Sequence, residues 1–269
     1  IEMVGFGKEK ALLKMNFLSG EIERTAEINI INKRTAVFDE KPLKSPSLLA
    51  GNFCAIVFSP EDLSLVKDGP SARRKFLDIA IGQLYPSYIN NLKSYSRALA
   101  QRNKIIKEYN FIPNGLEMLD VFEEEIFENG KKIISLRKEY LKRAQPFISE
   151  IYGGISKERE TLEITYISSS DEENLRNALY EARKTDIFSG VTSVGPHRDD
   201  LDFKINGISA RKYGSQGQQR SIALSLKLAE AKTLKEITGE EPVAILDDVM
   251  SELDPKRQDY ILNHIKDRQ

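Results

Sequence analysis

Several residue types that mark other protein classes are scarce in this chain of 269 residues. A single cysteine, Cys54, excludes a disulfide framework and a zinc site built from several thiolates. There are only two histidines, His197 and His264, so a metal site made of several histidines is not expected. Tryptophan is absent, and no apolar run approaches the roughly 20 residues that cross a bilayer. The sequence therefore predicts a cytoplasmic protein that does not span a membrane.

The composition is that of a folded protein with a balanced charge. Hydrophobic residues make up 40% of the chain and charged residues 30%, which is enough apolar material for one large core or two modest ones. The 40 basic and 41 acidic side chains leave a net charge of −1. Any surface that binds nucleic acid must therefore be a local basic patch.

Strand patterns occur near both ends of the chain. Alternating polar and apolar residues over 12–18 and 22–30, followed by 35–38, predict an antiparallel β meander. Short apolar runs predict further strands at 55–58, 162–167, 201–205 and 242–246. Helical patterns at 214–235 and 255–265 accompany the last two of these runs.

The middle of the chain is helical. Residues 71–109 are rich in helical signals with a break near Pro86, and 114–152 form a long amphipathic pattern. Residues 171–184 predict a helix with an acidic first turn. The fold class is thus α/β plus α, with a helical insertion between two α/β parts. The long pattern fits a projecting arm or hairpin and, equally, two helices of an ordinary bundle.

A glycine-rich turn opens the helix predicted at 214–235. The segment Tyr213-Gly-Ser-Gln-Gly-Gln-Gln-Arg220 places backbone N–H groups at the positive end of the helix dipole, where phosphate binds readily. Ser215 adds a hydroxyl, and the amides of Gln216 and Gln218 add further donors beside Gly217. When the motif is considered alone, simple helix capping by Ser215 is the favoured interpretation.

Two adjacent carboxylates end the apolar run Pro242-Val-Ala-Ile-Leu-Asp-Asp248. A run without alternation is typical of a strand buried on both faces, and acids at its carboxyl end lie where open α/β sheets bind ligands. Asp247 is a candidate ligand of Mg²⁺, and Asp248 is a candidate to orient or deprotonate an attacking water. Ser251-Glu-Leu-Asp-Pro255 follows, where Asp254 before Pro255 is also a good helix cap.

The order of these motifs resembles the ABC-type ATPase heads of chromosome-maintenance and DNA-repair proteins. In that family the Gly-Ser-Gln-Gly-Gln turn is the signature motif, the strand ending at Asp247 is Walker B, and Ser251 to Asp254 are the D-loop. Other segments are similar to the RecF family of bacterial recombination mediators, and the resemblance covers essentially the whole chain. They are Phe58-Ser-Pro-Glu-Asp-Leu63, Leu65-Val-Lys-Asp-Gly-Pro70, Arg73-Arg-Lys-Phe-Leu-Asp78 and Gly195-Pro-His-Arg-Asp-Asp-Leu201.

The resemblance implies an ABC-type head made of residues 1–70 and 195–269, with a mostly helical arm domain at 71–194. It implies a slow, DNA-stimulated ATPase that uses ATP and Mg²⁺. The protein would form an ATP-dependent homodimer in which Ser215, Gln216, Gly217 and Gln218 contact the nucleotide of the other subunit. It would bind double-stranded DNA and single-strand–double-strand junctions and, with RecR and RecO, promote RecA loading and SOS induction.

The sequence departs from the family pattern in two ways. No phosphate-binding loop of the form Gly-x-x-x-x-Gly-Lys-Ser/Thr is present, so we expect an internal segment that binds ATP weakly or not at all by itself and is inactive alone. Asp248 stands where many ABC ATPases have glutamate, and its shorter side chain fits a slow ATPase.

Basic side chains on two predicted helices are candidate DNA contacts, namely Arg73 and Arg74 on one and Arg97, Arg102, Lys104 and Lys107 on the other. Solvated helix faces carry such runs too, Arg74 also fits a buried structural role, and His197 fits a hydrogen-bonded structural histidine.

Two alternatives to a RecF-type ATPase stay open. One is another ABC-type repair ATPase, for which the arm at 71–194 is too short to form a long coiled coil. The other is a non-catalytic module that binds DNA or a partner protein.

Overall fold

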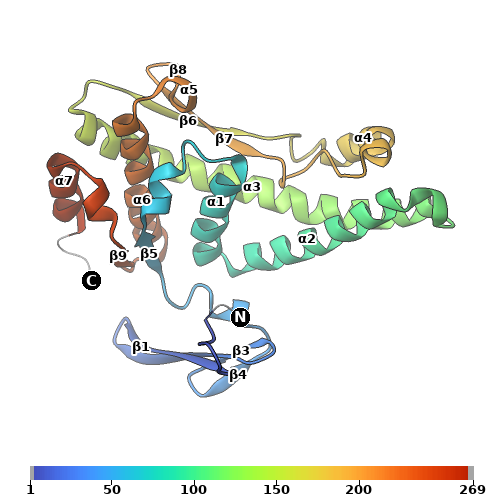
Figure 1. Cartoon of the computed structure of the whole chain (residues 1–269), viewed down its shortest axis with the longest axis horizontal. Helices are drawn as coiled ribbons and strands as arrows, with labels where there is room; N and C mark the ends of the chain where they lie inside the picture. Colours follow the sequence, from blue (N-terminus) through green and yellow to red (C-terminus); the bar gives the residue numbers. More distant parts are fainter. Residues whose placement is uncertain (1–2, 266–269) are drawn as a thin grey trace.

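The computed structural model describes residues 3–265, which form three small sheets and a set of helices (Figure 1). The amino-terminal meander consists of β1 (Ala11–Ser19), β2 (Ile22–Ile30), β3 (Arg34–Phe38) and β4 (Lys41–Leu43), paired antiparallel in chain order. The register pairs Ala11 with Ile30 and Ala26 with Phe38. The predicted meander is confirmed, and β4 extends it by one short strand.

A parallel pair of strands joins two segments that are far apart in the sequence. The strand β5 (Ala55–Phe58) pairs with β9 (Val243–Leu246) in the register Ala55 to Val243. Ile56 and Phe58 are buried on one face of the pair. On the other face Val57 and Ile245 keep exposed fractions of 44% and 45%, and Leu246, on the same face as Phe58, keeps 37%. The prediction of a carboxylate-bearing strand buried on both faces is therefore wrong, because Ile245 and Leu246 are exposed on opposite faces of β9 within residues 3–265.

The central helix of the core is α6 (Gln216–Thr238), which packs on α3, on β5 and on the 3₁₀ turn η2 (Pro60–Ser64). Its side chains are buried almost all round, including Ile222, Leu224, Leu226 and Ala229. Such a helix is an interior element rather than an amphipathic surface helix.

The remaining helices and strands complete the fold. They are α1 (Pro70–Leu84), α2 (Pro86–Lys107), α3 (Gly115–Ser156), β6 (Leu162–Ile167), α4 (Leu175–Ser189), β7 (Asp200–Ile205), β8 (Ile208–Ser209), α5 (Ala210–Tyr213) and α7 (Pro255–Ile265), with 3₁₀ turns η1 (Pro46–Leu49), η3 (Tyr109–Phe111) and η4 (Val249–Glu252). The strands β6, β7 and β8 form an antiparallel sheet.

The helices α2 and α3 lie against each other as a long hairpin that extends away from the sheets, with α4 beside its far end (Figure 1). The α3 pattern predicted at 114–152 is one helix of 42 residues, despite Pro146 in its interior. The projecting hairpin is thus the alternative that the structure shows.

The start of α4 differs from the prediction. The helix begins at Leu175, so the acidic residues of 171–173 precede it instead of forming its first turn. They meet cations of α3: Lys138 lies beside Asp171 and Glu172, and Lys131 lies 2.8 Å from Glu173. Ion pairing across elements, rather than the helix dipole, therefore accounts for these acids.

Candidate functional site

The predicted signature turn opens α6 through a reciprocal cap. Ser215 Oγ accepts a hydrogen bond from the Gln218 backbone N–H at 3.2 Å, and Gln218 Oε1 accepts one from the Ser215 N–H at 2.8 Å. The capping role of Ser215 is therefore confirmed. Ser215 and Gln216 are nevertheless exposed, and the N–H groups of Gln216 and Gly217 have no acceptor among residues 3–265. Unpaired N–H groups at a helix start attract anions, so capping and phosphate binding are compatible here.

Two side chains from another part of the fold hold Gln218 in place. Its Nε2 donates to Glu160 Oε1 at 2.7 Å, and the Tyr152 hydroxyl donates to Glu160 Oε2 at the same distance. Tyr152 is 1% exposed near the end of α3, and its burial raises the pKa of its hydroxyl. The signature turn is thus connected to the arm helix through Glu160. Sequence reasoning missed Glu160 and Tyr152, because nothing in a single sequence pairs residues this far from the motif.

The two acids that follow β9 are exposed at the end of the parallel strand pair. The Asp247 N–H still donates to the Phe58 carbonyl at 2.9 Å, which continues the pairing with β5 by one residue. Asp248 has φ 49°, a left-handed conformation, and its side chain makes no capping bond to η4. Within residues 3–265 neither carboxylate has a hydrogen-bonding partner, so capping does not explain them.

The acids fit a magnesium ion that also binds a nucleotide. No group of three or more potential metal-ligating side chains occurs in the described part of the chain. Mg²⁺ commonly takes one or two carboxylates and completes its shell with phosphates and water. An exposed Asp247 beside Asp248 satisfies that requirement, whereas a metal site made of protein ligands alone is not present among residues 3–265.

The predicted D-loop begins within η4 and ends immediately before α7. Ser251 Oγ donates to the Asp248 carbonyl at 2.8 Å, so the D-loop is fixed to the segment that carries the two acids. Asp254 Oδ1 accepts the N–H of Lys256 at 3.1 Å and of Arg257 at 3.3 Å, which confirms its capping role at the start of α7. Although partial burial opposes the effect, the Arg257 guanidinium and these N–H groups lower the pKa of Asp254.

The structure brings the D-loop and the signature turn together. Arg257 of α7 donates to the Gly217 carbonyl at 2.8 Å and also to Asp254. No described contact joins Asp247 or Asp248 to Ser215. Within one subunit Arg257 therefore links the signature turn to the D-loop, and no described hydrogen bond or ion pair links it to the two acids.

The motif at 195–201 is structural. His197 Nδ1 lies 2.6 Å from the Tyr95 hydroxyl, and its Nε2 lies 3.1 Å from the Thr192 carbonyl. Gly195 has φ 125°, and a Cβ there would lie 2.4 Å from the Tyr95 hydroxyl oxygen, so only glycine fits. The structural interpretation of His197 is confirmed.

Two acids of the same motif anchor α1. Asp200 accepts two bonds from Arg73, at 2.6 Å and 3.0 Å, and the Asp199 carbonyl accepts one from Arg74 at 2.8 Å. Arg73 is 1% exposed, so its prediction as a DNA contact is wrong. The guanidinium is already fully used inside the fold, whereas Arg74 is half-buried.

The basic residues of α2 are likewise partly buried in the fold and partly exposed. Arg102 is fully buried and donates to Glu123, Asp186 and Thr192, so its prediction as a DNA contact is also wrong. The others, Arg97, Lys104 and Lys107, are exposed. Arg97 pairs with Glu125 at 2.8 Å, which reduces the positive charge that it offers to a phosphate.

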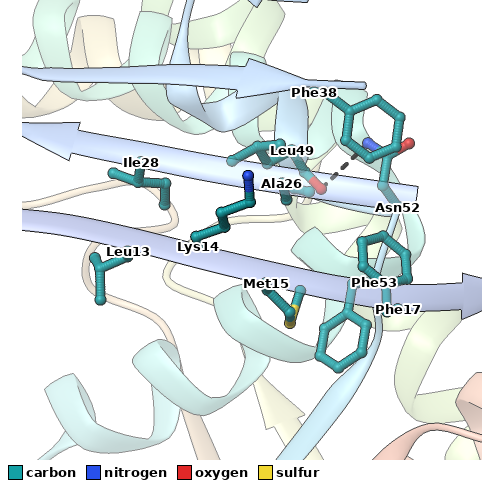
Figure 2. A pocket seen from close by; sticks show the side chains of 11 residues that line it. Leu13, Lys14, Met15, Phe17, Ala26, Ile28, Phe38, Leu49, Asn52 and Phe53 are labelled. Atoms are coloured by element: carbon teal, nitrogen blue, oxygen red, sulfur yellow. Dashed lines mark hydrogen bonds between the residues drawn. The ribbon is translucent and has the colours of Figure 1, made fainter. Parts of the chain in front are cut away.

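An apolar pocket of about 440 Å³ lies away from these motifs, under the amino-terminal meander (Figure 2). Phe17 meets Phe53 edge to face, with ring centroids 5.1 Å apart, and Phe38 lies 6.4 Å from Phe17. The polar side chains that line it are Lys14, which pairs with Glu27 at 2.7 Å, and Asn52, which bonds to backbone carbonyls. This lining has no group suited to phosphate or metal chemistry.

A signature turn, a strand ending in two acids and a D-loop, set in an α/β core with an inserted helical arm, define an ABC-type ATPase head. No family model matches the chain. Relatives named "DNA replication and repair protein RecF" are 38% identical in Agathobacter rectalis and 41% identical in Lachnoclostridium phytofermentans. These matches cover 100% and 98% of this chain and 75% and 74% of the relatives.

Solved structures give the same result. The recombination mediator protein RecF with ATP, of the RecFOR pathway, matches with a TM-score of 0.92 and 37% identity over 100% of this chain and 75% of that one. A second RecF structure matches with a TM-score of 0.89 and 36% identity over 98% of this chain. The chain belongs to the RecF family of DNA replication and repair proteins, rather than to another group of ABC-type repair ATPases.

Proposed function

We propose that this chain supplies one half of a composite ATP site, which is completed by a second subunit. The observation that carries the proposal is the exposed start of α6. There the N–H groups of Gln216 and Gly217 are unpaired and the Ser215 hydroxyl is at the surface. Gln218 belongs to the same turn, and its side chain is held by a hydrogen bond to Glu160. The start of α6 attracts the γ-phosphate of an ATP that is bound by the other subunit, and this attraction stabilises the dimer. After hydrolysis the attraction is weaker, so the dimer is less stable.

The acids after β9 have separate roles in this proposal. Asp247 would hold Mg²⁺, which supplies charge stabilisation to the phosphates, and Asp248 would orient the attacking water. The D-loop residues Ser251 and Asp254 would lie at the subunit boundary. The signature turn of one subunit and the acids of the other would then act on one nucleotide in a dimer.

The finer biological role is also proposed from the family. One RecF structure similar to this chain is described as a recombination mediator in the RecFOR pathway. We extend that role to this chain: a slow ATPase, working in the cytoplasm, whose dimer binds duplex DNA and single-strand–double-strand junctions and, with RecR and RecO, loads RecA and supports SOS induction. Residues 1–70 and 195–269 would be the head and 71–194 the arm. The exposed cations Arg97, Lys104 and Lys107, with Arg74, are the DNA contacts that burial leaves available.

A mixed assembly tests the composite site with the chain as it is. The chain is titrated into the RecF protein that was solved with ATP, in Mg-ATP or in Mg-ADP, and association is followed by sedimentation. We expect association in ATP that is lost in ADP, because the signature turn of this chain faces the ATP of the relative. The Ser215→Arg variant should abolish it by filling the space for the phosphate.

The matched control is Ser96→Arg, because Ser96 is an exposed serine of α2 outside the signature turn. This variant should associate like the unmodified chain. Association that ignores the nucleotide, or that survives Ser215→Arg, would contradict the composite site.

A further inference from the structure

The Arg257 side chain connects two motifs that are far apart in the sequence. Arg257 lies in the first turn of α7, immediately after the D-loop. Its Nη2 donates to the Gly217 carbonyl at 2.8 Å, and its Nε donates to Ser221 Oγ at 3.0 Å. Its Nη1 donates to Asp254 Oδ2. All three nitrogens of the guanidinium are thus occupied, two by α6 and one by the D-loop.

Both partners are arranged to receive this guanidinium. A Cβ on Gly217 would lie 3.0 Å from Arg257 Nη2, so glycine leaves room for the close approach to its carbonyl. Ser221 is 4% exposed and donates its own hydroxyl proton to the Gly217 carbonyl at 2.9 Å, which leaves its oxygen free to accept from Arg257. The planar fork of arginine suits several acceptors at fixed positions, whereas a lysine ammonium does not.

The D-loop end of the connection is equally fixed. One oxygen of Asp254 caps α7 while the other accepts from Arg257. A shift of the D-loop carboxylate therefore moves the guanidinium, and with it the Gly217 carbonyl. On its other side the signature turn is held by Glu160 through Gln218.

We propose that Arg257 is a positioning residue that makes the D-loop and the signature turn one rigid unit, so that both motifs meet a nucleotide held by another subunit together. The geometry supports the rigid unit by itself, and its consequence for dimer formation rests on the proposed function.

Hydrogen–deuterium exchange of the isolated chain tests the rigid unit without nucleotide. Arg257→Gln and Arg257→Lys should speed exchange of the hydrogen-bonded amides over 218–221 about tenfold, because either change removes bonds to the start of α6. Asp254→Asn should speed exchange of the same amides, since asparagine still caps α7 but no longer attracts the guanidinium. Lys256→Gln, an exposed neighbour in the same turn, is the control and should change nothing.

The mixed assembly in Mg-ATP gives the second result. Arg257→Gln and Arg257→Lys should weaken association about tenfold at unchanged thermal stability, while Lys256→Gln associates normally. Unchanged exchange in the Arg257 variants, or normal association of them, would overturn the proposal. If the unmodified chain itself fails to associate in ATP, the proposed function fails, and the exchange of the Asp254 and Arg257 variants decides the rigid unit alone.

Discussion

At the scale of single residues, His197 shows how the fold fixes a protonation state. The Thr192 carbonyl only accepts, so Nε2 carries the proton and Nδ1 accepts from the Tyr95 hydroxyl. Burial lowers the pKa of His197 and outweighs the Thr192 hydrogen bond, with Arg198 and Arg74 adding to the effect. The imidazole is therefore neutral in the folded protein and takes up a proton more readily when the chain unfolds.

This state predicts a pH-dependent stability. The contribution of His197 is complete above its ordinary pKa of about 6.5 and is lost as the pH falls toward the lower pKa of the folded state. Between pH 7 and 5 we expect the free energy of unfolding in urea to fall with a slope of at most about 1.4 kcal/mol per pH unit from this group. The His197→Gln variant, which keeps a donor and an acceptor but does not titrate, should lose that part of the slope.

The other histidine provides the control for this experiment. His264→Gln leaves His197 and its partners in place and should keep the slope. An equal slope in His197→Gln and the unmodified chain would show that His197 does not titrate between the folded and unfolded states.

At the scale of helices and strands, the arm is held together by buried charge. Arg102 of α2 reaches Glu123 of α3 and Asp186 of α4 within 3.0 Å, and Arg183 of α4 pairs with the same Glu123. The three helices thus share one network of ion pairs, and its central residue, Arg102, is buried. Such a network contributes little net stability when complete but is costly to break.

Removing the central cation should therefore destabilise the arm strongly. Arg102→Met leaves Asp186 buried without its ion-pair partner, and we expect the free energy of unfolding to fall by about 3–5 kcal/mol, measured by urea denaturation. Lys104→Met on the exposed face of the same helix should change it by no more than about 0.5 kcal/mol. A loss below about 1 kcal/mol for Arg102→Met would mean that the acids find other partners or bind protons.

The predicted and the observed elements together show which features of the fold a single sequence can predict. Strand and helix positions such as 55–58 and 255–265 follow local patterns, and the structure confirms them. The burial of Arg102 and the start of α4 depend on partners distant in the sequence, so local charge and dipole rules gave the wrong result there. The motifs at Ser215 and Asp254 were found because their capping chemistry is local. Glu160 and Arg257, which hold them, were missed because their roles exist only in three dimensions.

At the scale of the whole molecule, the chain has the signature turn, the acids and the D-loop but no phosphate-binding loop of the Gly-x-x-x-x-Gly-Lys-Ser/Thr form. The remaining groups at the start of α6 are two N–H groups and a hydroxyl, too few to bind a triphosphate tightly. This chain alone is therefore expected not to bind Mg-ATP with micromolar affinity.

Calorimetry of the isolated chain with Mg-ATP measures this directly, with the RecF protein that was solved with ATP as the positive control. We expect no heat of binding from this chain. A micromolar dissociation constant would reveal a phosphate-binding site within the chain that the sequence motifs do not show. If the isolated chain does not bind Mg-ATP but assembles with the RecF relative only in ATP, the result supports the composite site and argues against a non-catalytic binding module.

The pairing of β5 with β9 also governs how the molecule forms. The strand β5 ends at Phe58 and β9 begins at Val243. When the two strands pair, the chain between them, which includes the whole arm, is closed into one long loop. Closing so long a loop costs entropy that only later contacts repay, whereas α2 and α3 are neighbours in the chain and pair early. During synthesis the arm can therefore fold first, and β9 joins last. On this order of events, Asp247 and Asp248 reach their positions after the arm has formed.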